Sequence, residues 1–87
     1  MKIALDYDNT FTEDTGLWIA FVNNARGRGH SVAFVTSRSE TYENQDILSD
    51  AESLGIPVVF CNHEQKELHY AAHVWIDDSP EDIPEFL

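Results

Sequence analysis

Residues 2–10 read KIALDYDNT, and this stretch decides the fold expected for the chain. An apolar run of strand length ends at Leu5 and gives way at once to two aspartates, Asp6 and Asp8, with one residue between them. Asp and Asn are poor strand formers, and the small polar residues that follow favour a tight turn. The pattern predicts a buried strand that ends in a loop carrying carboxylates. Taken alone, it also fits an ordinary polar turn.

Three further apolar runs resemble the first and are separated by segments with helical spacing. The run SVAFV ends in Thr36 and Ser37, and the run HVWI ends in Asp77 and Asp78. Alternating strands and helices predict an α/β fold: a three-layer α/β/α, Rossmann-like arrangement around a small, mainly parallel four-stranded sheet. The expected strands are residues 2–5, 31–35, 56–60 and 73–76, and the expected helices are residues 15–28, 41–54 and 63–72.

The expected helices carry start and stop signals and one apolar face each. Thr15 can cap the first helix, Gly27 and Gly29 fit its end, and Gly55 fits the end of the second. Residues 11–16 are expected to form a short polar loop. The predicted inward faces are Leu17, Trp18, Phe21, Val22 and Ala25, then Ile47, Leu48, Ala51 and Leu54, then Leu68, Ala71 and Ala72.

The length of 87 residues and the hydrophobic content of 43% are typical of one domain, spanning residues 1–87, with one core. The single cysteine, Cys61, excludes an intramolecular disulfide. No apolar stretch approaches membrane-spanning length, and no basic segment opens the chain. We therefore expect a soluble, cytoplasmic protein without membrane contact.

The formal net charge of −11 comes from 16 Asp and Glu residues against 5 Lys and Arg residues. Such a surface repels phosphate backbones, which argues against nucleic-acid binding. A phosphorylated substrate would need a local cation and a few placed donors to overcome this field. A hard divalent metal ion is the obvious candidate.

Acidic residues follow two of the expected strands, and the carboxyl ends of parallel strands meet at one edge, where ligands bind. Asp6, Asp8, Asp77 and Asp78, with Asp82 as a further candidate, would crowd negative charge into a small volume. Such crowding either forces protonation or requires a cation. An oxygen-rich cluster with few nitrogen or sulfur ligands suits Mg²⁺.

Taken together, these strand ends resemble the four motifs of the haloacid dehalogenase (HAD) superfamily of phosphohydrolases, in order and over nearly the whole chain. The first motif, an apolar strand followed by Asp-x-Asp-x-Thr, is matched by IALDYDNT at residues 3–10. The second is matched by Thr36 at the end of the next apolar strand, and the third by Lys66. The fourth, an acidic pair after an apolar strand, is matched by VWIDDSP at residues 74–80. The resemblance implies a HAD-like catalytic core and a phosphatase.

The resemblance also implies roles for these residues. Asp6 would be the nucleophile that forms an aspartyl-phosphate, with its other oxygen on Mg²⁺. Asp8 would protonate the leaving group and then activate water, with its backbone carbonyl on the metal. Asp78 is the preferred remaining metal ligand and Asp77 the second choice, because Asp78 and Asp82 also fit an Asp-x-x-x-Asp variant. Thr36 and Lys66 would stabilise the transferring phosphoryl group, and the full set of candidate phosphate-binding residues is Asn9, Thr10, Thr36, Ser37, Arg38 and Lys66.

Two departures from the family pattern bear on function. Asn9 stands where the family most often has Gly, although Asn also tolerates a left-handed backbone. No insertion is long enough for a cap domain, so the site is expected to be open to its phosphorylated substrate. A second copy of the chain or a partner protein could cover it.

Other interpretations stay open at this point. Arg38 fits a surface position as well as a phosphate contact, and Cys61, His63, His69 and His73 could be imagined as a zinc site.

A phosphotransferase would use the same residues, and a binding or regulatory module could keep the metal site with little turnover. The remaining acids, Glu13, Asp14, Glu40, Glu43, Asp46, Asp50 and Glu52, are interpreted as solvated, and the aromatics Trp18, Phe21, Phe34, Phe60 and Trp75 as core.

Overall fold

A four-stranded parallel sheet and two α-helices make up the fold in the computed structural model, which describes residues 1–79. The strands are β1 (Lys2–Leu5), β2 (Ser31–Thr36), β3 (Val58–Phe60) and β4 (Val74–Ile76), in the order β3-β2-β1-β4. Every neighbouring pair is parallel, which confirms the predicted α/β class and the four-stranded parallel sheet. The helices are α1 (Thr15–Gly27) and α2 (Gln45–Leu54), and two short 3₁₀ helices are η1 (Phe11–Glu13) and η2 (Lys66–Leu68).

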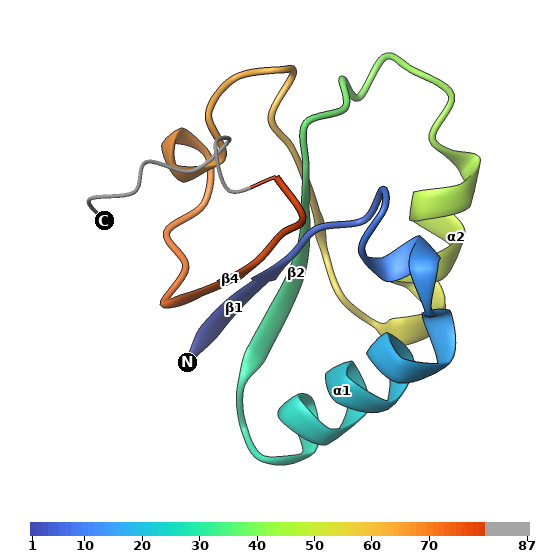
Figure 1. The fold of residues 1–87 in the computed structure, drawn as a ribbon, viewed down its shortest axis with the longest axis vertical. Helices are drawn as coiled ribbons and strands as arrows, with labels where there is room; N and C mark the ends of the chain where they lie inside the picture. The colour runs from blue at the N-terminus through green and yellow to red at the C-terminus, as the bar shows by residue number, and fades with distance from the viewer. Residues whose placement is uncertain (80–87) are drawn as a thin grey trace.

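Both α-helices cover the same face of the sheet (Figure 1). Side chains alternate along a strand, so Ile3 and Leu5 of β1 point to this face while Ala4 points to the other. The helix-covered core also contains Val32 and Phe34 of β2. The two central strands, β1 and β2, are buried on both faces after their first residue, which agrees with their nearly continuous apolar sequence.

The opposite face is covered by the segment after β3, and here the predicted third helix is wrong. Residues 63–72 contain only the single 3₁₀ turn η2, and Leu68, expected to point inward, is 69% exposed. The backbone is left-handed at Asn62 and His63, with φ of 51° and 62°, which interrupts helical geometry at the expected start. The third layer of an α/β/α arrangement is therefore not confirmed.

Helix α1 matches its predicted range but differs at its start. The side chain of Asp14, not Thr15, accepts the Leu17 backbone N–H at 3.1 Å and caps the helix. Val22 and Ala25 are buried as predicted, but Leu17, expected to point inward, is 55% exposed. Leu17 lies in the first turn, beyond the edge of the core.

Helix α2 begins at Gln45, four residues after the predicted start at Thr41. Residues 37–44 form a loop instead, in which the Asn44 side chain donates to the Ser39 carbonyl at 3.0 Å. Ile47, Ala51 and Leu54 are buried as predicted, but Leu48 is 49% exposed. The helix ends at Gly55, which takes the left-handed conformation expected of a C-terminal glycine.

The loop after β1 is fixed by aromatic packing rather than being a plain polar loop. Phe11, inside the segment predicted to be polar, is almost fully buried. Its ring stacks on Tyr7, with centroids 5.5 Å apart, and lies edge-on to Phe34 at 4.9 Å. Aromatic pairs of this kind each contribute about 0.5–1.5 kcal/mol beyond area burial. The loop that carries the first two aspartates is thereby anchored to the core.

No helix within residues 1–79 has both the length and the apolar character needed to cross a membrane.

Candidate active site

The carboxyl ends of β1, β2 and β4 meet around one small cavity of about 160 Å³. Asp6 directly follows β1, Thr36 ends β2, and Asp77 directly follows β4. Because β1 pairs with both β2 and β4, these three ends lie side by side. The cavity is lined by Asp6, Asp8, Asn9, Thr36, Ser37, Asp77, Asp78 and Ser79, so seven of the candidate residues from the sequence are brought together.

Asp6 lies at the centre of the site and is only 7% exposed. Its backbone N–H donates to the Ile76 carbonyl of β4 at 2.9 Å, which fixes the position of the residue at the sheet edge. One carboxylate oxygen accepts the Lys66 ammonium at 2.8 Å, and the other accepts the Thr10 hydroxyl at 2.9 Å. Each carboxylate oxygen can accept more than one hydrogen bond, so both keep capacity for a further partner.

The charge state of Asp6 is set by competing effects. Burial raises the pKa of its carboxyl, the hydrogen bond and positive charge of Lys66 lower it, and Asp77 and Asp78 raise it again. The net result is a pKa raised to about 6. The two neighbouring acids therefore offset part of the stabilisation that Lys66 gives to the charged carboxylate.

Lys66 supplies the positive charge beside Asp6 and Asp77. It comes from η2, in the segment on the face of the sheet opposite α1 and α2. Its side chain is 1% exposed, and its ammonium donates to both Asp6 and Asp77. Burial opposes the charged form, but the hydrogen bonds to the two carboxylates outweigh it, so the pKa of Lys66 is raised. The single turn η2 is sufficient to deliver this side chain, although a longer helix was predicted there.

Three carboxylates, those of Asp6, Asp77 and Asp78, each place an oxygen within 4.8 Å of the others. Asp77 uses one oxygen for Lys66 and the other to accept the Ser79 backbone N–H at 2.9 Å. Asp78 is exposed at the rim of the same cavity. An all-oxygen group of this size is the kind that a hard divalent cation such as Mg²⁺ takes in proteins.

Thr36 and Asn9 shape the wall of the cavity. The hydroxyl of Thr36, almost fully buried, accepts the Arg38 backbone N–H at 3.2 Å, and such a hydroxyl can still donate its own hydrogen. Asn9 has a left-handed backbone with φ of 63°, and its N–H donates to the Thr12 hydroxyl at 3.0 Å. The expectation that Asn can replace Gly at this turn agrees with this geometry.

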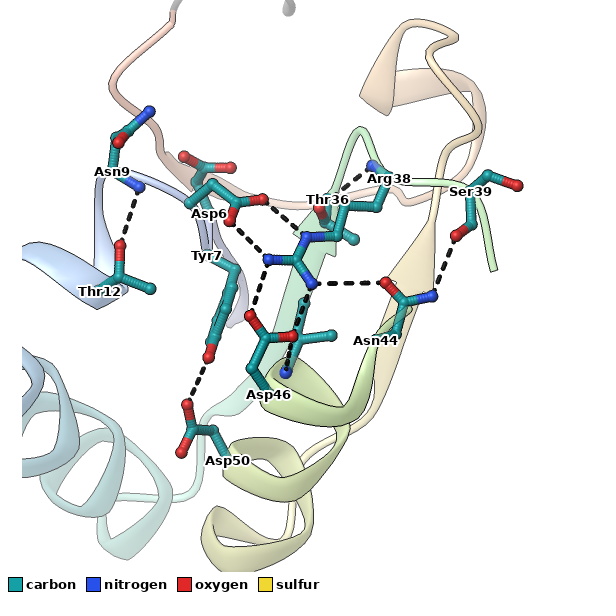
Figure 2. Close-up of polar contacts among 12 residues, drawn as sticks. Asp6, Tyr7, Asn9, Thr12, Thr36, Arg38, Ser39, Asn44, Asp46 and Asp50 are labelled. Carbon is teal, nitrogen blue, oxygen red and sulfur yellow. Dashed lines mark hydrogen bonds and ion pairs between the residues drawn. The ribbon is translucent and has the colours of Figure 1, made fainter. Parts of the chain in front are cut away.

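Arg38 is paired with two carboxylates, those of Asp8 and Asp46. Figure 2 shows its contact with Asp46 and a further one with the side-chain oxygen of Asn44. It donates to both oxygens of Asp8, at 2.9 and 2.7 Å, and to both oxygens of Asp46, at 2.7 and 3.0 Å. Asp46 was interpreted from the sequence as a solvated residue. Its role depends on a contact between the loop after β2 and the start of α2, which residues distant in the sequence from Asp8 make together.

A second acid of α2 also reaches the site region. The Tyr7 hydroxyl donates to an Asp50 oxygen at 2.5 Å, and the Arg38 guanidinium lies 5.3 Å from the centre of the Tyr7 ring (Figure 2). Burial, followed by the Asp50 contact, raises the pKa of Tyr7. Asp46 and Asp50 are four residues apart and so lie on one face of the helix, which is the only sequence signal for their shared role.

Two predictions from the sequence, a zinc site and a role for Asp82, are not part of this cavity. In the part of the chain that the structure describes, the three acids above are the only group of three or more metal-binding side chains that converge, so the imagined zinc site does not form. His69 instead pairs with Glu64 at 2.8 Å, and His73 accepts the Lys2 backbone N–H. Asp82 lies outside the described residues.

Comparisons with protein-family models, with curated proteins and with solved structures found no match to this chain. The resemblance to the HAD superfamily therefore rests on the four motifs and stays a prediction.

Proposed function

We propose that the chain is a small HAD-type phosphatase without a cap domain, which hydrolyses a phosphate monoester through an aspartyl-phosphate at Asp6. One observation carries this proposal: the buried Asp6 has one oxygen on Lys66 and the other on Thr10, beside Asp77 and Asp78. A purely structural polar turn would not require a buried carboxylate with two buried partners. The order of the four motifs along the chain supports the same function.

The donor set fits Mg²⁺, because it consists of carboxylate oxygens and lies beside a cavity large enough for a phosphate group. Asp6 and Asp78 would hold the ion together with the Asp8 backbone carbonyl. Asp78 is preferred to Asp77 because Asp78 is exposed at the cavity, whereas the side chain of Asp77 is only 4% exposed. When bound, the ion would neutralise charge on the carboxylates and on the transferring phosphoryl group.

In the first half-reaction, a carboxylate oxygen of Asp6 forms a bond to phosphorus while the bond from phosphorus to the leaving oxygen breaks. Asp8 gives its proton to that oxygen, so the product departs as an alcohol. The ammonium of Lys66 stabilises negative charge on Asp6 and on the phosphoryl oxygens, and the Thr36 hydroxyl donates to one of them.

In the second half-reaction, the ionised Asp8 takes a proton from a water molecule whose oxygen bonds to phosphorus. The bond between phosphorus and Asp6 breaks at the same centre, and inorganic phosphate leaves. Asp6 returns as a carboxylate and Asp8 returns protonated, so the cycle balances.

The test is turnover of an aryl phosphate with and without Mg²⁺, in the wild type and in Asp6→Asn and Asp6→Ala. We expect Mg²⁺-dependent release of phosphate in the wild type and its loss in both variants. The alanine variant guards against slow conversion of Asn back to Asp. Activity that survives in Asp6→Ala would exclude the mechanism.

The same assay separates the alternatives. Transfer of phosphate to an added alcohol in preference to water would identify a phosphotransferase. A wild type with no turnover across a panel of phosphorylated compounds would point to a binding or regulatory module instead.

A further inference from the structure

The Arg38 guanidinium is fully engaged within the protein. Arginine has five N–H donors, and five hydrogen bonds run from Arg38 to Asp8, Asp46 and the Asn44 side-chain oxygen. Each of the two carboxylates accepts two hydrogen bonds from Arg38, one on each oxygen, which is the paired geometry that arginine and carboxylate prefer. Asp8 belongs to the cavity, whereas Asp46 and Asn44 belong to the start of α2.

The arginine itself is held in place on three other sides. Its backbone N–H donates to the Thr36 hydroxyl, and its backbone carbonyl accepts the Asn62 N–H at 3.1 Å. The Tyr7 ring lies against the guanidinium, and Tyr7 is tied in turn to Asp50 of α2. Asp8, by contrast, has a half-exposed side chain. Arg38 is therefore the rigid partner that determines where the Asp8 carboxylate lies.

We propose that Arg38, anchored by Asp46, is a positioning residue that holds the Asp8 carboxyl group at the cavity, keeping its hydrogen bond to one Asp8 oxygen while the other oxygen carries the proton for the leaving group. The inference deepens the proposed function and rests on it. A phosphate group could bind Arg38 only by displacing Asp8 or Asp46, because every donor already has a partner. Positioning of Asp8 requires only that one of the two hydrogen bonds from Arg38 opens when that Asp8 oxygen carries the proton.

The consequence depends on the leaving group. A poor leaving group such as phenol needs the proton of Asp8, whereas dinitrophenolate departs without one. Misplacing Asp8 should therefore slow the first half-reaction with phenyl phosphate far more than with dinitrophenyl phosphate. The ratio kcat/KM reports on this half-reaction alone, since the transfer to Asp6 is its first irreversible step.

The experiment measures kcat/KM for both substrates in the wild type and in Arg38→Ala, Arg38→Lys and Asp46→Asn. Asp46→Asn leaves the cavity lining intact and keeps the test valid where Arg38→Ala fails to fold. Glu52→Gln, an exposed acid on the same helix, is the matched control. Lysine keeps the positive charge but cannot make the paired contacts, so Arg38→Lys should resemble Arg38→Ala.

We expect kcat/KM for phenyl phosphate to fall about 10-fold in Asp46→Asn and about 100-fold in Arg38→Ala, with changes under about 3-fold for dinitrophenyl phosphate. Equal losses of kcat/KM on both substrates would overturn the positioning role. So would a rise in KM alone, or an unchanged kcat/KM in Asp46→Asn and Arg38→Ala. A rise in KM on both substrates would assign Arg38 to phosphate binding. Lack of Mg²⁺-dependent turnover in the wild type would contradict the proposed function itself, which is a separate result.

Discussion

Lys66 is the residue on which the acidic site most depends. Its buried ammonium is hydrogen-bonded to Asp6 and Asp77, while Asp78 lies within 4.8 Å of both carboxylates. Removing one partner of a buried ion pair costs more than the pair contributes, because the remaining charges stay buried without compensation. At the scale of single residues, stability and the proposed catalysis would therefore depend on the same side chain.

Replacement of Lys66 by Met should lower the free energy of unfolding by about 3–5 kcal/mol in metal-free buffer. Methionine has a similar length, so the loss would come from the charge and its hydrogen bonds. Urea denaturation with a chelator present would measure it. The control is Lys2→Met, the only other lysine of the chain, whose contact with the Tyr70 ring is exposed and is worth about 0.5–1 kcal/mol. Equal losses in the two variants would contradict this account of Lys66.

Asp46 should make stability depend on pH at the acidic end. The hydrogen bond from Arg38 lowers the pKa of Asp46 from 3.8 to about 2. Because the folded carboxyl holds its proton less tightly than the unfolded one, the pairing stabilises the fold fully above about pH 5. This contribution is lost as the pH falls towards 2, and it is modest because the Asp46 side chain is half-exposed.

The measurement is the difference in unfolding free energy between the wild type and Asp46→Asn, taken by urea denaturation across this pH range. We expect a constant difference above about pH 5 that shrinks steadily below about pH 4. A difference that grows on acidification would mean that the folded state binds the Asp46 proton more tightly, against the geometry described.

The sequence predicted the acids at the ends of β1 and β4 and a place for Lys66 beside Asp6, because strand ends and the four motifs are local patterns. It did not predict that Lys66 is buried. It did not predict the partners of Arg38. The contact with Asp46 joins a loop to a helix and arises only when α2 packs against the sheet. The partners of a long side chain such as Arg38 lie on another element, so no repeating pattern in the sequence indicates them.

At the scale of elements, the end of α2 depends on the left-handed conformation of Gly55. Gly55 has φ of 70°, and an added Cβ would lie 3.0 Å from the Arg26 side chain, which donates to the Leu54 carbonyl at 2.6 Å. Gly55→Ala should therefore destabilise the protein by about 1–2 kcal/mol. Thermal unfolding followed by circular dichroism would measure this.

Gly27, in the last turn of α1, is the matched control, since nothing lies within 4 Å of an added Cβ there. Gly27→Ala should stabilise by about 0.4–1 kcal/mol, because alanine restricts the unfolded chain. Two substitutions of the same kind should thus shift the melting temperature in opposite directions. Shifts of the same sign would contradict the assignment of these helix ends.

The two α-helices were predictable because their apolar residues recur with helical spacing, and the third predicted helix failed for a tertiary reason. Residues 63–72 have helical composition, but the backbone is left-handed at Asn62 and His63. Lys66 also points into the core to reach Asp6, which a solvated helix face would not allow. The requirements of the site override local propensity in this segment.

At the scale of the whole molecule, a net charge of −11 makes a bound cation stabilising. Mg²⁺ that binds only the folded state should raise the free energy of unfolding by about 1.4 kcal/mol when its concentration is tenfold above the dissociation constant. Thermal melts at constant ionic strength, with and without Mg²⁺, would measure this. The gain should vanish in Asp78→Asn and persist in Glu43→Gln, an exposed acid away from the cavity. Equal gains in both variants would indicate general screening instead of a site.

The central claim is that Asp6 becomes phosphorylated, and acid-quenched mass spectrometry tests it most directly. Asp8→Asn should retain fast transfer from dinitrophenyl phosphate but lose the group that activates water, so the intermediate should accumulate. We predict one added phosphoryl group on the peptide that contains Asp6 in this variant, and none when Asp6→Ala is combined with it. A phosphoryl group on another residue, or turnover in Asp6→Ala, would contradict the account.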